Sequence, residues 1–217
     1  MIKKFNKDNI LGPEGFSEGL EELINDKDKI REFCNSNYEL VHEETRRDPL
    51  TQLYNQVEIE NILSKDFDIA SEEKDRFYVL FIDINHFKKI NDTLGHLKGN
   101  EILKDTADIL RGCIRKTISE DGTKSDCIGR YGGDEFLMIL YDIRKEDLTK
   151  ILERFVSRGI SYIKKLNKRV DLGVKNPFAV GWAEFNPYSD DEISVDSLIR
   201  EAEKNMYSHK KYIKDKN

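Results

Sequence analysis

The hydrophobic positions of this chain change their period several times, and each change predicts a new structural element. Over residues 17–46, apolar residues recur at spacings of three and four, which predicts a helix with one apolar stripe. The stripe is close to a heptad period, although Lys27 interrupts it, so it fits either a helix packed on its own domain or a two-stranded coiled coil. Because Pro49 ends the pattern, we expect an N-terminal helical extension over residues 1–46 and a second domain over residues 47–217.

The second domain alternates apolar runs of strand length with longer amphipathic stretches. Continuous apolar runs predict strands, and apolar spacings of three and four predict helices. In chain order the pattern predicts a helix over residues 56–65, a strand over 76–84, one long helix over 86–116, a hairpin with strands 127–131 and 136–143, a helix over 145–166, a strand over 176–185 and a helix over 194–212. This order predicts an α+β fold, with helices packed on a largely antiparallel sheet.

The turn of the predicted hairpin carries unexpected charge. Its residues are Gly132, Gly133, Asp134 and Glu135. A tight turn of the Asn-Gly type would join the strands without two carboxylates at the tip. Asp83 interrupts the preceding apolar strand near its end, so three acids meet if that strand pairs with the hairpin. Carboxylates held this close repel one another unless a divalent cation offsets their charge, and Asp83 therefore argues against a merely solvated hairpin tip.

A magnesium and polyphosphate site would explain both the acids and the glycines. Mg²⁺, or Mn²⁺ in its place, takes one or two carboxylates and fills its other positions with water and substrate phosphates. Glycines let a polyphosphate lie against the backbone amides. Positive charge is available from Lys88, in the first turns of the helix after Asp83, and from Lys210 and Lys214, which share one face of the last helix. Each lysine alone would more often be a solvated surface residue.

The composition excludes several other classes of protein. With 217 residues, 38% apolar and 36% charged, the chain has room for one good core plus an extension. A net charge of −6 argues against a general nucleic-acid binder. The three cysteines, Cys34, Cys113 and Cys127, are widely spaced and fit a reducing compartment. Because no apolar run reaches membrane-spanning length and the N-terminus lacks a signal-peptide core, we expect a cytoplasmic protein without a membrane segment.

Four sequence blocks resemble one known family. The blocks "DPLTQLYN", "FIDINHFKKINDTLGHLKGNEIL", "GRYGGDEF" and "EAEKNMYSHKK" are similar to the GGDEF family of diguanylate cyclases, in matching order over about residues 46–217. The resemblance implies a palm-like fold akin to nucleotide cyclases and polymerases. It also implies a signalling enzyme that condenses two GTP molecules into cyclic di-GMP with release of pyrophosphate. Since each domain would offer one triphosphate site, the active species would be a homodimer.

The resemblance also implies roles for individual residues. Asp83, the carbonyl of Ile84 and Asp134 would hold Mg²⁺, and Glu135 would support the metal site. Asp134 matches the residue that helps to deprotonate the attacking hydroxyl, so Asp134, Glu135 and Lys88 are the expected catalytic residues. The positions that match substrate contacts are Phe87, Lys88, Asn91, His96, Asn100, Gly132, Gly133, Lys210 and Lys214.

The sequence departs from the family pattern at three positions. Thr123 replaces the arginine of the Arg-x-x-Asp product-inhibition motif that ends at Asp126, which puts feedback control in doubt. Asn100 replaces the aspartate that reads guanine, and Asn85 replaces an acid. Three functions therefore stay open. They are a cyclase with GTP as the favoured substrate, a cyclase that also uses ATP to give a hybrid or adenine product, and a degenerate module that binds nucleotide or a partner without turnover.

Overall fold

The domain is built on one antiparallel sheet with the strand order β2-β3-β1-β4. A computed structural model describes residues 45–114, 125–167, 173–189 and 193–215. The strands are β1 (Phe77–Ile84), β2 (Cys127–Gly132), β3 (Glu135–Tyr141) and β4 (Phe178–Phe185). All three strand pairings are antiparallel, which confirms the predicted fold class. The helix expected over residues 17–46 lies outside the described residues but for its last two positions, so the division of the chain stays a prediction.

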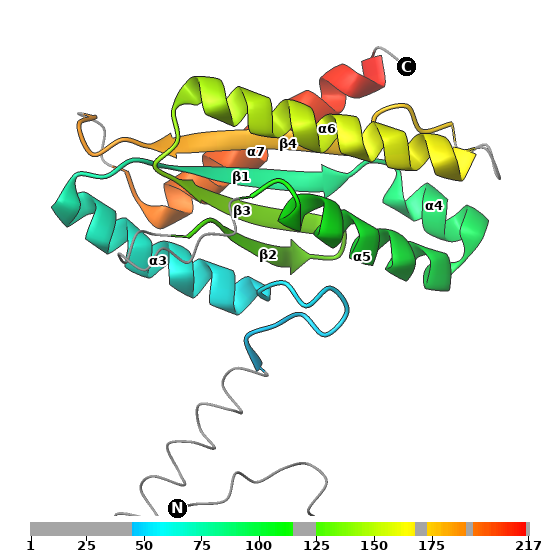
Figure 1. Cartoon of the computed structure of the whole chain (residues 1–217), viewed down its shortest axis with the longest axis horizontal. Helices are drawn as coiled ribbons and strands as arrows, with labels where there is room; N and C mark the ends of the chain where they lie inside the picture. Colours follow the sequence, from blue (N-terminus) through cyan, green and yellow to red (C-terminus); the bar gives the residue numbers. More distant parts are fainter. Residues whose placement is uncertain (1–44, 115–124, 168–172, 190–192, 216–217) are drawn as a thin grey trace, which may run out of the picture. The chain divides into compact units, whose positions relative to one another are not determined.

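Helices cover both faces of the sheet (Figure 1). They are α3 (Gln56–Glu73), α4 (Phe87–Leu94), α5 (His96–Arg111), α6 (Lys145–Asn167) and α7 (Val195–Asp215). Helices α4, α5 and α6 contribute to one buried cluster, and α3 and α7 contribute to the other. The central strand β1 therefore has a core on each side, and this arrangement gives the three-layered architecture of an α+β domain.

Burial on both faces explains why β1 is a continuous apolar run. Successive side chains of a strand point to opposite faces. Tyr78 and Leu80 accordingly pack with α4, α5 and α6, whereas Val79 and Phe81 pack with α3 and α7. Every residue of β1 is buried, Asp83 included. An acid in this strand thus enters a desolvated environment, which requires a partner for its charge.

The long helix predicted over residues 86–116 is wrong, because the chain breaks it at Gly95. There the backbone has φ 82° and ψ 158°, which separates α4 from α5. The apolar periodicity continues across the break, and so the pattern did not reveal it. A glycine reaches this conformation without a side-chain penalty. The break folds α5 back against α4, and a Cβ at Gly99 would lie 1.8 Å from Oδ1 of Asn91.

The break leads to the first prediction. Gly95→Ala should destabilise the domain by about 1–3 kcal/mol, because alanine is strained at this φ and ψ. A Cβ at this position would meet no atom within 4 Å, so the penalty would come from the backbone alone. Urea unfolding measures the change. Thr93→Ala, on the exposed surface of α4, is the control and should shift the free energy of unfolding by no more than about 0.5 kcal/mol. Equal stability of Gly95→Ala and the wild type would show that alanine is not strained at this φ and ψ.

Candidate active site

The antiparallel pairing of β1 and β3 brings three acids to one end of the sheet. Asp83, near the end of β1, pairs with Glu135, the first residue of β3. The N–H of Ile84 donates to the carbonyl of Asp134 at 3.2 Å, so the hairpin tip is bonded directly to the end of β1. The carboxylates of Asp83, Asp134 and Glu135 therefore belong to one local cluster.

Lys210 of α7 is the ionic partner of Asp83. Its Nζ lies 2.7 Å from Oδ1 and 2.6 Å from Oδ2 of Asp83, and the acid is only 5% exposed. A carboxylate this buried is stable in its charged form only when a cation and hydrogen bonds replace water. The sequence predicts Lys210 as a phosphate contact, and the structure adds this bond to the acid.

The other two acids carry uncompensated charge. Burial, and then the charge of Asp83, raise the pKa of Asp134 above its ordinary value. Burial, Asp83 and Asp134 raise the pKa of Glu135 in the same way. Lys210 lowers both pKa values, but less than these effects raise them. The cluster therefore has an excess of negative charge that a further cation would offset.

The donor set fits a magnesium ion better than a softer metal. Asp83, Asp134, Glu135 and the carbonyl of Ile84 offer only oxygen, which Mg²⁺ prefers. The ammonium of Lys210 on both oxygens of Asp83 marks a position where positive charge is favoured. Within the described ranges, no three His, Cys, Asp or Glu side chains stand close enough to hold a metal ion by themselves.

Two hydrogen bonds from Arg130 hold the glycine turn in place. The Nε and Nη2 atoms of Arg130 donate to the carbonyl of Gly133 at 3.0 and 2.6 Å. Its Nη1 lies 3.1 Å from Oδ2 of Asp48. Gly133 has a φ of +28°, and a Cβ there would meet no atom within 4 Å, so the turn is open on its outer side. The two-glycine tip is thus held in place while it leaves space for a ligand.

Asp48 is itself held by the segment before α3. Its Oδ1 accepts from the N–H of Thr51 at 2.8 Å and from the hydroxyl of Thr51 at 2.7 Å. Burial acts to raise the pKa of Asp48, but the bonds from Thr51 and the charge of Arg130 hold that pKa below its ordinary value. The apolar pattern of the sequence did not predict this role of Asp48. The signal is the Asp-Pro-Leu-Thr run, because an aspartate commonly bonds backbone N–H groups a few residues ahead in a turn.

The break at Gly95 creates a second part of the site, between α4 and α5. Asn91 lies against Gly99, and Phe87 lies near the same glycine. Within the described part of the chain, Oδ1 of Asn91 is a buried oxygen without a hydrogen-bond partner. His96 and Asn100 are exposed and four residues apart on α5, so they share one face of it. The structure thus brings the side chains that the resemblance assigns to the base to one pair of helices.

The remaining lysines are placed less closely. Lys88 and Lys214 are both exposed, and no bond to the three acids is recorded for either of them among the described residues. Burial, and then the charges of Lys89, Lys214 and Lys210, lower the pKa of His86. Those three ammonium groups therefore lie near His86, in the loop between β1 and α4.

One of the three departures from the family pattern, Asn85, has a structural explanation. Asn85 is buried, its Nδ2 donates to the carbonyl of Asn176 at 3.1 Å, and its N–H donates to the carbonyl of Pro177 at 2.8 Å. An ionised acid could not donate the side-chain bond. Asp126 is also buried, and its Oδ1 accepts from the N–H of Tyr141 at 3.2 Å. Thr123 lies outside the described residues.

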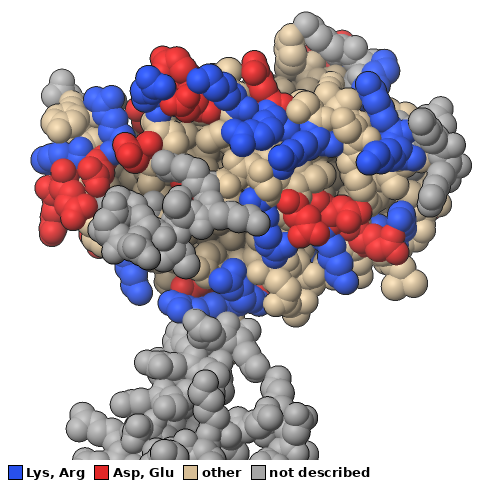
Figure 2. Space-filling view, viewed as in Figure 1, with Lys and Arg blue, Asp and Glu red and all other residues tan. Residues whose placement is uncertain are grey.

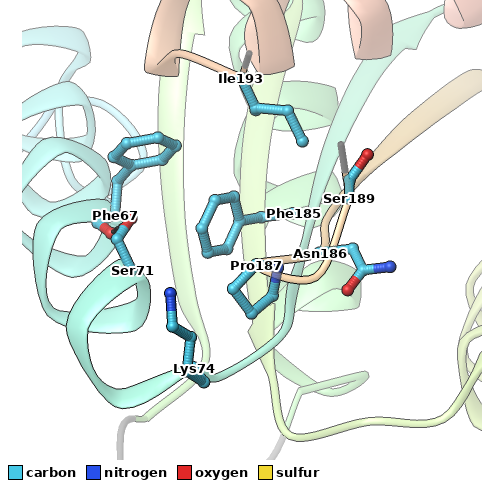
Figure 3. A pocket seen from close by; sticks show the side chains of 8 residues that line it. All are labelled: Phe67, Ser71, Lys74, Phe185, Asn186, Pro187, Ser189 and Ile193. Carbon is cyan, nitrogen blue, oxygen red and sulfur yellow. Dashed lines mark hydrogen bonds between the residues drawn. The ribbon is translucent and has the colours of Figure 1, made fainter. Parts of the chain in front are cut away.

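A groove elsewhere on the domain is not this site. It has a volume of about 240 Å³ and is lined by Phe67, Ser71, Lys74, Phe185, Asn186, Pro187, Ser189 and Ile193 (Figure 3). Phe185 pairs with Phe77 at the start of β1, whereas Asp83 pairs with Ala179 near the other end of the sheet. The groove therefore lies at the opposite end of β1 from the acids.

Figure 2 shows a face of the molecule on which acidic and basic side chains are interspersed.

The four-stranded antiparallel sheet carries paired acids and a glycine turn at one end, and its family follows from similarity to known proteins. Residues 45–216 match the family model described as "Diguanylate cyclase, GGDEF domain". The chain belongs to the GGDEF-domain diguanylate cyclase family. None of the described helices has the length and apolarity to cross a bilayer.

Curated relatives and solved structures agree with this assignment. The chain is 30% identical over 199 residues to diguanylate cyclase TpbB of Pseudomonas aeruginosa, covering 91% of this chain and 42% of that protein. It is 31% identical over 173 residues to diguanylate cyclase DosC of Escherichia coli, covering 80% of this chain and 35% of that protein. The coiled coil and GGDEF domain of DgcB from Caulobacter crescentus, in complex with c-di-GMP, is similar with a TM-score of 0.71 and 25% identity, covering 88% and 94% of the two chains. The chain thus spans less than half of these two curated relatives.

The raised pKa values in the acid cluster lead to the second prediction. A carboxyl whose pKa is higher in the folded than in the unfolded state binds more protons when folded, so stability falls as the pH rises from about 4 through the raised pKa. Asp134→Asn should remove this penalty and stabilise the metal-free domain by about 0.5–1 kcal/mol at pH 7, a value reduced for partial exposure. The gain should vanish below about pH 4, where Asp134 is protonated in both states.

Urea unfolding between pH 4 and pH 8 measures this difference. Asp92→Asn removes an exposed carboxylate from α4 and is the matched control, which should stay within about 0.5 kcal/mol of the wild type. A loss of stability in Asp134→Asn at pH 7 would show that the acid is stabilised in the folded domain and that the cluster is not repulsive.

Proposed function

We propose that this protein is a diguanylate cyclase that condenses two GTP molecules into cyclic di-GMP and releases pyrophosphate. The observation that carries the proposal is the cluster formed where Asp83 pairs with Glu135, with Lys210 bonded to Asp83. A hairpin turn without a ligand would not require the neighbouring strand β1 to carry a buried acid near its end. The family membership and the open glycine turn support the same conclusion.

The chain's own residues would bind and orient the triphosphate. Gly132 and Gly133 would let the phosphates approach the backbone of the turn, which Arg130 holds from the other side. Lys88, Lys210 and Lys214 would supply positive charge to the phosphates, with Lys210 also anchored on Asp83. These residues would act by positioning the phosphates and by offsetting their charge, and these two effects dominate phosphoryl-transfer catalysis.

The acids would hold the metal and accept a proton. Asp83, the carbonyl of Ile84 and Asp134, supported by Glu135, would hold Mg²⁺, which when bound offsets phosphate charge during the in-line displacement at the α-phosphate. The 3′-oxygen of one nucleotide attacks this phosphorus, the bond to pyrophosphate breaks, and an oxygen of Asp134 accepts the hydroxyl proton.

Two copies of the domain would be required for each product molecule. Each domain has one acid cluster and one open turn, so two nucleotides react only when two sites face each other. A homodimer would meet this requirement. The predicted apolar stripe over residues 17–46 supports it, since a two-stranded coiled coil would align a pair of domains.

A second candidate function concerns the choice of base. Aspartate can accept two hydrogen bonds from the guanine edge, whereas Asn100 offers one acceptor and one NH₂ donor. The same donor and acceptor pair matches adenine. Asn91, against Gly99, stays beside the site as a second base contact, so GTP remains the favoured substrate and ATP would be used measurably. The products would then include a hybrid or an adenine-only cyclic dinucleotide.

The third prediction tests the reaction itself. Asp83→Asn should lower Mg²⁺-dependent release of pyrophosphate from GTP at least about a hundredfold, because the isosteric amide removes a charged metal ligand. Products are identified by mass after incubation with each nucleoside triphosphate. Circular dichroism checks the fold, because Asp83→Asn keeps the side-chain volume but removes the counter-charge of Lys210.

The control and the contrary results separate the competing functions. Asp92→Asn on the exposed surface of α4 should keep wild-type turnover. A wild-type chain that binds GTP without releasing pyrophosphate would be a binding module and not an enzyme. Unchanged turnover in Asp83→Asn at saturating Mg²⁺ would remove Asp83 from the site.

The fourth prediction tests base choice. Asn100→Asp should raise discrimination of GTP over ATP by roughly five- to 150-fold, which corresponds to about 1–3 kcal/mol for one buried unpaired donor. A competition assay with equal GTP and ATP, with products separated by mass, gives the ratio. Lys104→Ala, one turn further along α5 on an exposed position, is the control and should leave the ratio unchanged. If the native chain already excludes ATP as completely as Asn100→Asp does, Asn100 does not set base choice.

A further inference from the structure

Helix α7 crosses the edge strand β4 in direct backbone contact at one glycine. A Cβ at Gly181 would lie 1.9 Å from the backbone nitrogen of Met206 and 2.2 Å from the carbonyl oxygen of Ala202. These distances leave no room for any side chain. The strand order β2-β3-β1-β4 leaves β4 at one edge of the sheet. The backbone of α7 therefore contacts this edge strand at Gly181.

Two side chains of α7 bond to the strand on either side of that point. The N–H of Val180 donates to Nδ1 of His209 at 3.1 Å, and the same nitrogen lies 3.1 Å from the carbonyl oxygen of Val180. The Nδ2 of Asn205 donates to the carbonyl of Trp182 at 2.9 Å. Asn205 and His209 are four residues apart and so share one face of the helix. We call Val180, Gly181, Trp182, Asn205 and His209 the α7 seat.

The seat uses backbone groups that face away from the sheet. Val180 pairs with Ile82 and Trp182 pairs with Leu80 in the register of β4 against β1. In an antiparallel pair, alternate residues direct their N–H and C=O groups outward. At an edge these groups would be unpaired and could bind another strand. Asn205 satisfies the carbonyl of Trp182, and Nδ1 of His209 bonds either the N–H or the carbonyl of Val180, according to its tautomer.

The seat lies directly beside the acid that Lys210 holds. Lys210 follows His209 in the helix, and its Nζ bonds both oxygens of Asp83. Asp83 pairs with Ala179, which precedes Val180 in β4. A shift of α7 by one residue would rotate its side chains by about 100° and move them by about 1.5 Å, which would take the lysine off the acid.

Apolar burial and hydrogen bonds both favour this register of α7. Leu198, Ala202 and Met206 are buried against the sheet, and they determine which face of the helix meets it. The hydrogen bonds of Asn205 and His209 depend on the positions of single atoms, so they define the position of that face on β4 more closely. The seat thus adds atom-specific contacts to a helix face that apolar burial already selects.

We propose that Asn205 and His209 are positioning residues, which hold α7 in the register that places Lys210 on Asp83 and, through it, against the triphosphate of a bound nucleotide. The second part of this inference rests on the proposed function. The first part, the placement of Lys210, concerns the protein without nucleotide and can be tested separately.

The first experiment measures the placement of Lys210 without nucleotide. The Lys210 side chain is 26% exposed and bonded to Asp83, so it should react slowly with an acetylating reagent, with Lys211 as the internal reference. His209→Ala should raise the relative rate of acetylation at Lys210 about three- to tenfold, the range expected for loss of one hydrogen bond. His209→Asn should restore the wild-type rate, because its amide can occupy the position of Nδ1. Ser208→Ala, on the neighbouring exposed position, is the matched control and should have no effect.

The second experiment measures the affinity for a non-hydrolysable GTP analogue by calorimetry. His209→Ala should weaken binding about three- to tenfold in the wild-type background and have no further effect in a Lys210→Ala background. Equal losses in both backgrounds would show that His209 does not act through Lys210 and would overturn the proposal. An unchanged acetylation rate in His209→Ala, or failure of His209→Asn to restore it, would also overturn it. Changed acetylation with no nucleotide binding by the wild type would support the seat and reject the proposed function.

Discussion

The buried carboxylate of Asp83 is the constraint on which the rest of this domain depends. A central strand covered on both faces excludes water from every side chain it carries, and an acid there needs a cation of its own. Lys210 supplies that charge from α7, at the far end of the sequence. The charge balance at this end of the sheet therefore depends on the position of the last helix on β4.

The same end of the sheet shows how a repulsive site is kept in shape. Asp134 and Glu135 lie close to Asp83, and burial with like charge raises the pKa of both. Repulsion among the three carboxylates opposes this geometry. The turn is held from outside by Arg130, whose partners are the carbonyl of Gly133 and the carboxylate of Asp48. Bonds outside the three carboxylates thus keep the repelling groups in place.

The sequence predicted the elements that have a strong local period, and missed features that depend on single residues or distant partners. Fold class, strand positions and the acids at the tip followed from apolar runs and from an acid where an apolar residue was expected. The break at Gly95 was missed because periodicity continues across it, and only the backbone angles reveal it. The bond of Lys210 to Asp83 joins residues 127 positions apart, and no local pattern encodes such a contact.

The two asparagines that depart from the family pattern carry different meanings once their surroundings are known. Asn85 is buried, and its amide donates to a carbonyl that an ionised acid could not satisfy, so its presence has a structural cause and does not indicate lost function. Asn100 is exposed on α5. It follows Gly99, which lies against Asn91 of α4. Packing places little demand on an exposed side chain, and so its identity is left to whatever it contacts from solvent. For this reason the proposal on substrate choice rests on the second asparagine and not on the first.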